Sequence, residues 1–263
     1  NSISALVRAH NNIGTMYVTL GELETAGEHI VECHRLSEHY GHHGFARFAE
    51  GGPLLGMAYH AGRWDDVIAG ADAFLADMSP NYQRAPALAL RSLVRLGRDD
   101  TAGAAEDAER ALEVARPAGD PQIVLPALSI ASTIRYSVGD EQSAGELVDE
   151  AVPEIRRLRQ LGFAGVWAHG LAWVAWALGR GAEFLAAVDD DQLETPWVRG
   201  ARAVGRGEFT AAADAFGAIG AKTEEAFYRL RSGEQLGPAL AFYRSVRATR
   251  YIREAEERLA ATA

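Results

Sequence analysis

Apolar residues recur at helical intervals along this chain, and glycines interrupt them. Near the N-terminus, Ile13, Tyr17 and Leu20 are four and three residues apart, which places them on one face of a helix. The same intervals return after Gly21, in the set Leu23, Ala26, Ile30, Cys33 and Leu36. Glycine is the usual residue just past a helix end because it adopts the left-handed conformation without steric cost. The pattern therefore predicts two amphipathic helices joined by a turn at Gly21.

Glycines of this kind recur through the chain, each just before a short polar turn and a new amphipathic segment. The six positions are Gly21, Gly62, Gly97, Gly139, Gly179 and Gly207. They are 41, 35, 42, 40 and 28 residues apart. A period of this length is typical of stacked helical hairpins, each too small to bury its own apolar face.

We therefore expect an all-α fold, a right-handed α–α superhelix of about six helical hairpins with a C-terminal capping helix. The whole chain, 1–263, forms one solenoid in this interpretation. Its expected units span 1–44, 45–80, 81–120, 121–162, 163–194 and 195–222, followed by a cap over 223–263.

Three local features refine this prediction. In the second unit, one helix is expected to run to Tyr59 before the turn at Gly62. Pro153 falls inside a helix of the fourth unit, where we expect a kink or a break. The run Asp189-Asp190-Asp191 lacks the alternating spacing of a calcium loop and predicts a solvated loop.

Two stretches resemble known families. Asn12-Ile13-Gly14, Tyr17, Leu20-Gly21-Glu22 and Ala26 resemble a tetratricopeptide repeat. Residues 173–180, 239–246 and 248–254 resemble the closing segment of large actinobacterial signalling proteins. Those proteins join a nucleotide-cyclase-like or DNA-binding output domain to an AAA-type or STAND ATPase module and end in tetratricopeptide-like repeats. The resemblance implies a regulatory region whose partners include the ATPase and output domains of a parent chain.

Composition narrows the function. A formal net charge of −10, from 26 basic and 36 acidic residues, argues against direct nucleic-acid binding. Cys33 is the single cysteine, so no intrachain disulfide or cysteine-based zinc site is expected, which fits the cytoplasm. The uncharged run 163–178 is shorter than the roughly 20 residues that span a bilayer, and it predicts a buried solenoid helix. Since Asn1 is no initiator methionine and enters a helix at once, we expect a piece of a longer multidomain protein.

Candidate chemistry is sparse. Gly220-Ala221-Lys222-Thr223 ends like a phosphate-binding loop, but Ala221 replaces its second glycine and no strand is predicted before it. Five histidines gather near the N-terminus, and His29 precedes Cys33 by four residues. No acidic residue completes a recognisable metal motif there, so a solvated helix end is favoured over zinc binding. No hydrolase or dinucleotide motif occurs. We expect no catalytic residue, no cofactor and no metal.

The concave face is the expected binding site. In the tetratricopeptide family, the first helix of each pair lines a groove that binds peptides. Counted from the turn glycines, the groove residues would be Arg8, Asn11, Asn12, Thr15, Tyr59, His60, Arg84, Arg91, Arg95, Tyr136, His169, Trp173 and Trp197. Arginine forks beside aromatic rings suit carboxylates, phosphates and extended peptides.

These features predict a non-catalytic protein- or peptide-binding regulatory scaffold. One alternative is a self-association or packing scaffold, whose groove is filled by a second copy or by the chain's own C-terminal helices around Tyr243 and Tyr251. A more remote alternative is a helical-repeat hydrolase, which would need two or more carboxylates converging in a central cavity.

Overall fold

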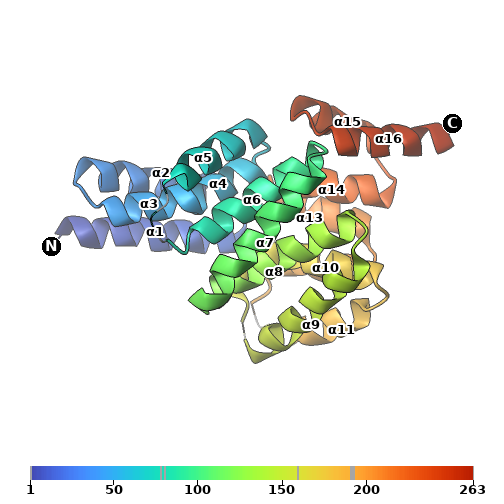
Figure 1. Cartoon of the computed structure of the whole chain (residues 1–263), viewed down its shortest axis with the longest axis horizontal. Helices are drawn as coiled ribbons and strands as arrows, with labels where there is room; N and C mark the ends of the chain where they lie inside the picture. Colours follow the sequence, from blue (N-terminus) through green and yellow to red (C-terminus); the bar gives the residue numbers. More distant parts are fainter. Residues whose placement is uncertain (1, 78, 80, 159, 190–192, 263) are drawn as a thin grey trace.

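The computed structural model describes residues 2–77, 79, 81–158, 160–189 and 193–262. Every regular element among these residues is helical, as the sequence predicts. The elements are α1 (Ser2–Leu20), α2 (Leu23–His39), α3 (His43–Gly51), α4 (Pro53–His60), α5 (Trp64–Ala76), α6 (Arg84–Gly97), α7 (Thr101–Ala118), α8 (Pro121–Ser137), α9 (Glu141–Arg157), the 3-10 helix η1 (Gly162–Trp167), α10 (Ala168–Ala177), α11 (Gly181–Val188), α12 (Pro196–Gly205), α13 (Phe209–Ala218), α14 (Lys222–Ser232), α15 (Leu236–Ser245) and α16 (Thr249–Thr262). The all-α fold class is confirmed, and consecutive helices pair as hairpins (Figure 1).

Most of the turn glycines act as expected. Gly21, Gly62, Gly139, Gly179 and Gly207 have φ between 74° and 89°, the left-handed region that favours glycine. Gly97 is the exception, because α6 runs through it and Asp99 takes the left-handed position with φ 70°. Gly220 makes a further turn of this kind between α13 and α14.

The second unit departs from the sequence prediction. A break at Gly52-Pro53 divides the helix expected to reach Tyr59 into α3 and α4. Proline has no N–H to donate and fits the first position of a new helix, so α4 starts afresh at Pro53. Of the kink or break expected at Pro153, a break does not occur, because α9 continues through Pro153 to Arg157. Asp190 and Asp191 lie outside the described residues.

The C-terminal helices return to the N-terminal hairpins. The indole Nε1 of Trp197 donates to the Val18 carbonyl oxygen at 2.7 Å. The Phe242 ring covers the turn at Gly62, where a Cβ would meet it at 2.6 Å. In Figure 1 the orange and red helices α14–α16 accordingly lie beside the ends of α4 and α6. Helices that are far apart in the sequence therefore pack against each other.

One apolar core runs from Val18 to Ala255, and a small cluster of Val7, Cys33 and Leu36 lies at the N-terminal end. The uncharged run 163–178 forms η1 and α10, which are largely buried, as expected. Within the described ranges, none of the helices combines the length and the apolar character needed to cross a membrane.

Candidate functional site

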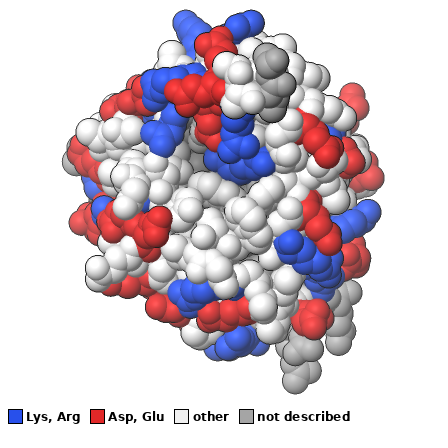
Figure 2. All heavy atoms as spheres, turned by 90° about the vertical axis from the view of Figure 1, so that its right-hand side faces the viewer, with Lys and Arg blue, Asp and Glu red and all other residues white. Residues whose placement is uncertain are grey.

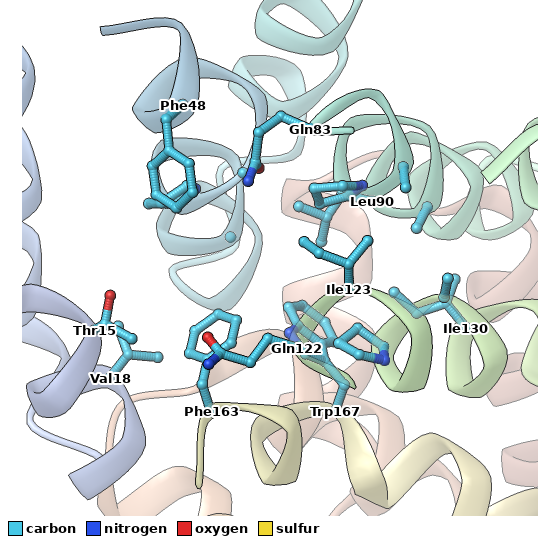
Figure 3. Close-up of a pocket in the computed structure, with 18 of the residues that line it drawn as sticks. Thr15, Val18, Phe48, Gln83, Leu90, Gln122, Ile123, Ile130, Phe163 and Trp167 are labelled. Carbon is cyan, nitrogen blue, oxygen red and sulfur yellow. The ribbon is translucent and has the colours of Figure 1, made fainter. Parts of the chain in front are cut away.

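An apolar pocket lies between α1, α4, α6, α8 and η1, with a volume of about 120 Å³. We call it the apolar pocket, and its labelled lining residues in Figure 3 are Thr15, Val18, Phe48, Gln83, Leu90, Gln122, Ile123, Ile130, Phe163 and Trp167. They come from α1, α3, α6, α8 and η1 and from the residue just before α6, and in Figure 3 they surround one central space.

Small residues on facing helices create this space. Gly56 of α4, Ala89 of α6 and Ala127 of α8 all line the pocket. A Cβ built on Gly56 would meet no atom within 4 Å. The large rings of Phe48, Phe163 and Trp167 form part of its wall.

The apolar pocket borders a wider outer hollow of about 1040 Å³, which shares Phe48, Tyr82 and Gln83 with it. The other residues of the outer hollow are Asn11, Gly41, His42, His43, Gly44, Phe45 and Asn81. Its carboxamides belong to Asn11, Asn81 and Gln83, so it offers hydrogen-bond donors and acceptors beside an apolar wall. The Gln83 carboxamide points toward the apolar pocket in Figure 3 and has no hydrogen bond within the described ranges.

His60 joins the apolar pocket to the C-terminal helices. It lines the pocket, and its ring stacks on Trp167 with centroids 5.0 Å apart. Its Nδ1 lies 2.6 Å from Oε1 of Glu224 on α14, and both side chains are at most 2% exposed. Next to this pair, the Trp64 indole donates to the Thr223 hydroxyl, which donates to the Tyr59 carbonyl oxygen. Five residues of α4, α5 and α14 are thus held by buried hydrogen bonds.

A second, smaller cavity lies beyond Trp167 and Ile130, which line both spaces. We call it the inner cavity, and its volume is about 30 Å³. Its lining residues are Tyr59, Leu93, Ser129, Ile130, Thr133, Trp167, His169, Gly170, Thr223, Glu224 and Phe227. A Cβ at Gly170 would lie 2.8 Å from Ser129 Oγ and 2.9 Å from Thr133 Oγ1, so only glycine lets α10 approach α8 this closely.

Burial shifts the ionisation of two groups at the inner cavity. Burial lowers the pKa of His169 from 6.5 to about 4, so its imidazole is neutral at pH 7. Burial also opposes the ionisation of Glu224, but the charge and hydrogen bond of His60 bring the pKa of this carboxyl below its ordinary value. Glu224 is therefore a carboxylate at neutral pH.

Five of the predicted groove residues line one of these spaces. Asn11 lines the outer hollow, and Thr15 and His60 line the apolar pocket. Tyr59 and His169 line the inner cavity.

The remaining aromatic candidates serve packing instead. Tyr136 and Trp173 meet edge to face at 5.2 Å, and the Arg231 guanidinium lies 4.5 Å from the Trp173 ring centroid. Trp197 is fully buried. Arg8 and Asn12 are exposed on α1 and line none of the spaces described above.

The predicted arginine-lined groove needs correction. The Arg91 guanidinium donates twice to Asp107 at 2.7 Å and once to Asp72 at 2.5 Å, with only 8% of the residue exposed. Arg95 approaches the same Asp107 carboxylate at 3.0 Å. Arg84 donates to the Asp77 carbonyl oxygen at 2.6 Å. These arginines lie on the sides of α6 that face α5 and α7, so carboxylates and carbonyls of the chain itself satisfy them.

Counting from the turn glycines did not select Phe48, Gln83 or Trp167, all of which line the apolar pocket. The signal that could have found the pocket is the set of small residues facing inward, Gly52, Gly56, Ala85, Ala89 and Ala127. Small residues that face one another from α4, α6 and α8 leave a space, and the neighbouring large rings enclose it.

The histidine-rich segment, expected to be a solvated helix end, contains several pairs of side chains. Cys33 is buried, and burial raises the pKa of its thiol, which disfavours the thiolate form that binds metals. His29 instead contacts His10, with Nδ1 atoms 3.0 Å apart. His34, Glu38 and Glu50 have donor atoms within 4.8 Å of one another and could together hold a metal ion. Arg47 already pairs with Glu50 at 3.0 Å, which opposes a second cation there.

The segment Gly220-Ala221-Lys222-Thr223 forms the turn and first residues of α14. Its Thr223 hydroxyl is engaged inside the fold with Tyr59 and Trp64, so this segment is an inter-helix turn.

Charge is mixed on the face of the molecule seen in Figure 2. Basic and acidic side chains alternate there around an uncharged central hollow. The charged side chains on this face do not form one broad patch of a single sign.

No protein-family model matches this sequence, and no curated protein matches it. The resemblance to tetratricopeptide repeats and to signalling ATPases therefore stays a prediction from the residues quoted above.

Proposed function

We propose that this chain is a non-catalytic scaffold that binds a segment of a partner protein and holds one apolar side chain of that segment in the apolar pocket. The observation that carries the proposal is that the apolar pocket adjoins the carboxamide-bearing outer hollow, with Phe48, Tyr82 and Gln83 in both.

The size of the apolar pocket suits a single anchor. An apolar cavity of about 150 Å³ holds a benzene-sized group. A pocket of about 120 Å³ is smaller than this and therefore matches one leucine or methionine side chain of a partner. Burying such a side chain contributes about 1.5–3 kcal/mol, and anchors of this kind dominate interface affinity.

The outer hollow suits the backbone on either side of that anchor. A bound peptide must satisfy its N–H and C=O groups. The side-chain amides of Asn11, Asn81 and Gln83 offer both donors and acceptors for them.

The lining residues argue against a hydrolase. Asp120 is the one carboxylate that lines the apolar pocket, and Glu224 is the one that lines the inner cavity, within the residues that the structure describes. Glycoside hydrolysis, for example, needs two carboxylates about 5–10 Å apart across the same space.

The contact between His60 and Glu224 supports a regulatory role. His60 lines the apolar pocket, and its partner lies on α14, so a side chain in the pocket acts directly on the junction with the C-terminal helices. Regulation requires that the ligand favour one of two arrangements of that junction. With the resemblance of residues 239–254, this supports a place in a larger cytoplasmic signalling ATPase or transcriptional regulator.

A peptide selection tests the proposal. Random peptides displayed on phage are selected on the immobilised protein, and the dissociation constants of enriched peptides are measured by fluorescence anisotropy. We expect the enriched peptides to share one apolar residue. Gly56→Leu fills the apolar pocket from α4 without a clash of its Cβ, and we expect it to weaken binding at least about tenfold. Gly237→Leu on α15 is the matched control, since its Cβ also meets nothing within 4 Å.

Equal binding of the peptides to wild type and Gly56→Leu would refute the proposal, as would the absence of any enriched peptide. A second copy of the chain as occupant is recognisable by light scattering, because the wild type would then dimerise and Gly56→Leu would not. The chain's own helices α15 and α16 do not occupy the pocket, since Trp167 is the last residue in its lining.

A further inference from the structure

Three buried polar atoms at the inner cavity have no hydrogen-bond partner among the described residues. They are Oε2 of Glu224, Nε2 of His169 and Oγ1 of Thr133. Glu224 is only 1% exposed, and its other carboxylate oxygen contacts His60. Because buried polar atoms are nearly always satisfied, three unpartnered atoms around one cavity indicate a group that binds there.

The hydrogen bonds of Tyr228 fix the role of His169. The Tyr228 hydroxyl donates its single proton to the His169 carbonyl oxygen at 2.9 Å. His169 Nδ1, which lies 3.0 Å from the Tyr228 oxygen, must then donate to it. Since this imidazole is neutral at pH 7, the proton on Nδ1 leaves a lone pair on Nε2. Nε2 is therefore a hydrogen-bond acceptor.

The other two atoms also accept hydrogen bonds. Oε2 of the Glu224 carboxylate is an acceptor only, and the Thr133 hydroxyl oxygen has lone pairs available. The aromatic rings of Tyr59, Trp167 and Phe227 complete the lining, and none of the lining residues is a lysine or an arginine. Aromatic faces and carboxylates both attract cations.

We infer that the inner cavity binds a compact primary ammonium group, whose three N–H donors meet Glu224 Oε2, His169 Nε2 and Thr133 Oγ1. The volume agrees, because about 30 Å³ has room for roughly two water-sized groups, the size of methylammonium. The half-buried side chains of Leu93 and Phe227 form part of the wall that such a group would pass. This site goes beyond the proposed peptide binding and does not depend on it, since Trp167 and Ile130 separate the inner cavity from the apolar pocket.

Titration with methylammonium chloride, followed by NMR of the backbone amides, tests this inference. We expect saturable shifts at Thr133, His169 and Glu224, beyond those that sodium chloride causes at the same concentration. Tetramethylammonium should cause none, because it has no N–H and is too large. Glu224→Gln should weaken methylammonium binding at least about tenfold, the effect of losing a hydrogen bond to a charged group. Glu225→Gln, whose carboxylate pairs with Arg229 instead, is the matched control and should bind normally.

The inference is overturned if methylammonium produces no shifts beyond those of sodium chloride, in which case the cavity takes water only. It is also overturned if Glu224→Gln binds methylammonium as tightly as the wild type. Should Glu224→Gln fail to fold, Thr133→Val decides the matter, because it removes one acceptor at nearly constant shape and should weaken binding several-fold. Gly56→Leu should leave methylammonium binding unchanged, so failure of this inference is distinguishable from failure of the proposed function.

Discussion

The apolar pocket and the inner cavity share Ile130 and Trp167, yet their chemistry differs. On α8, Ile123, Pro126 and Ala127 face the apolar pocket, whereas Ser129 and Thr133 face the inner cavity. Phe163 and Trp167 of η1 line the pocket. The rest of its lining comes from α1, α2, α3, α4, α6 and α8 and from the segments between these helices. The inner cavity also draws His169 from α10 and Glu224 from α14. The lining of α8 is therefore apolar at one end and polar at the other. The polar end is where α10 and α14 bring ionisable side chains against α8.

The largest effect expected from this difference is on stability. Glu224→Ala removes the buried partner of His60 and should lower the free energy of unfolding by about 3 kcal/mol or more, because one member of a buried pair is left alone. Urea unfolding followed by tryptophan fluorescence measures it. Glu225→Ala removes a partly exposed pair with Arg229 and should cost about 1 kcal/mol or less. If the two variants lost similar free energies of unfolding, the buried pair of His60 and Glu224 would stabilise the fold no more than an exposed pair.

The second largest expected effect is a pH dependence of stability, which arises from His169 at the inner cavity and not from the apolar pocket. The folded pKa of His169 is about 4 and its ordinary value is 6.5, so the unfolded chain binds the proton first as pH falls. The neutral imidazole of His169 therefore contributes fully to the free energy of unfolding above pH 6.5. This contribution is lost progressively as the pH falls toward 4. Each pKa unit corresponds to about 1.4 kcal/mol, so we expect a loss of about 2 kcal/mol between pH 6.5 and about pH 5.

Urea unfolding of wild type and His169→Asn at both pH values measures this loss. Asparagine keeps a donor near Tyr228 but does not titrate, so the variant should lose less stability than the wild type on acidification. The exposed His39→Asn is the control and should follow the wild type. Parallel curves for wild type and His169→Asn would contradict the assignment of a neutral, buried imidazole.

The smallest expected effect concerns the apolar pocket alone. Gly56→Ala adds one methyl group to α4 in open space, so the variant should gain about 0.5–1 kcal/mol of stability from helix propensity. Thermal unfolding by circular dichroism detects this as a small rise in Tm. A loss of stability would mean that a methyl group at Gly56 clashes with neighbouring atoms, so that the space beside Gly56 is not open.

Part of the site was predictable from the sequence for a simple reason. Counting along a helix from a turn glycine gives the direction of nearby side chains, and Thr15 and His60, which were chosen in this way, both line the apolar pocket. The same counting was wrong for Arg91, because its direction relative to α6 does not reveal the carboxylate of Asp107 on the next helix. Gln83 and Trp167 escaped because the segments before α6 and before α10 have no repeat pattern.

The sequence by itself determined the helical hairpins, since helix periodicity and turn glycines are local properties of the chain. Only the tertiary structure decided that Glu224 meets His60 across 164 residues. That contact depends on the fit of distant surfaces, such as Phe242 against the turn at Gly62. Local periodicity carries no information about which remote surface fits which, so the apolar pocket, the inner cavity and the buried pair between them arise only when the solenoid returns on itself.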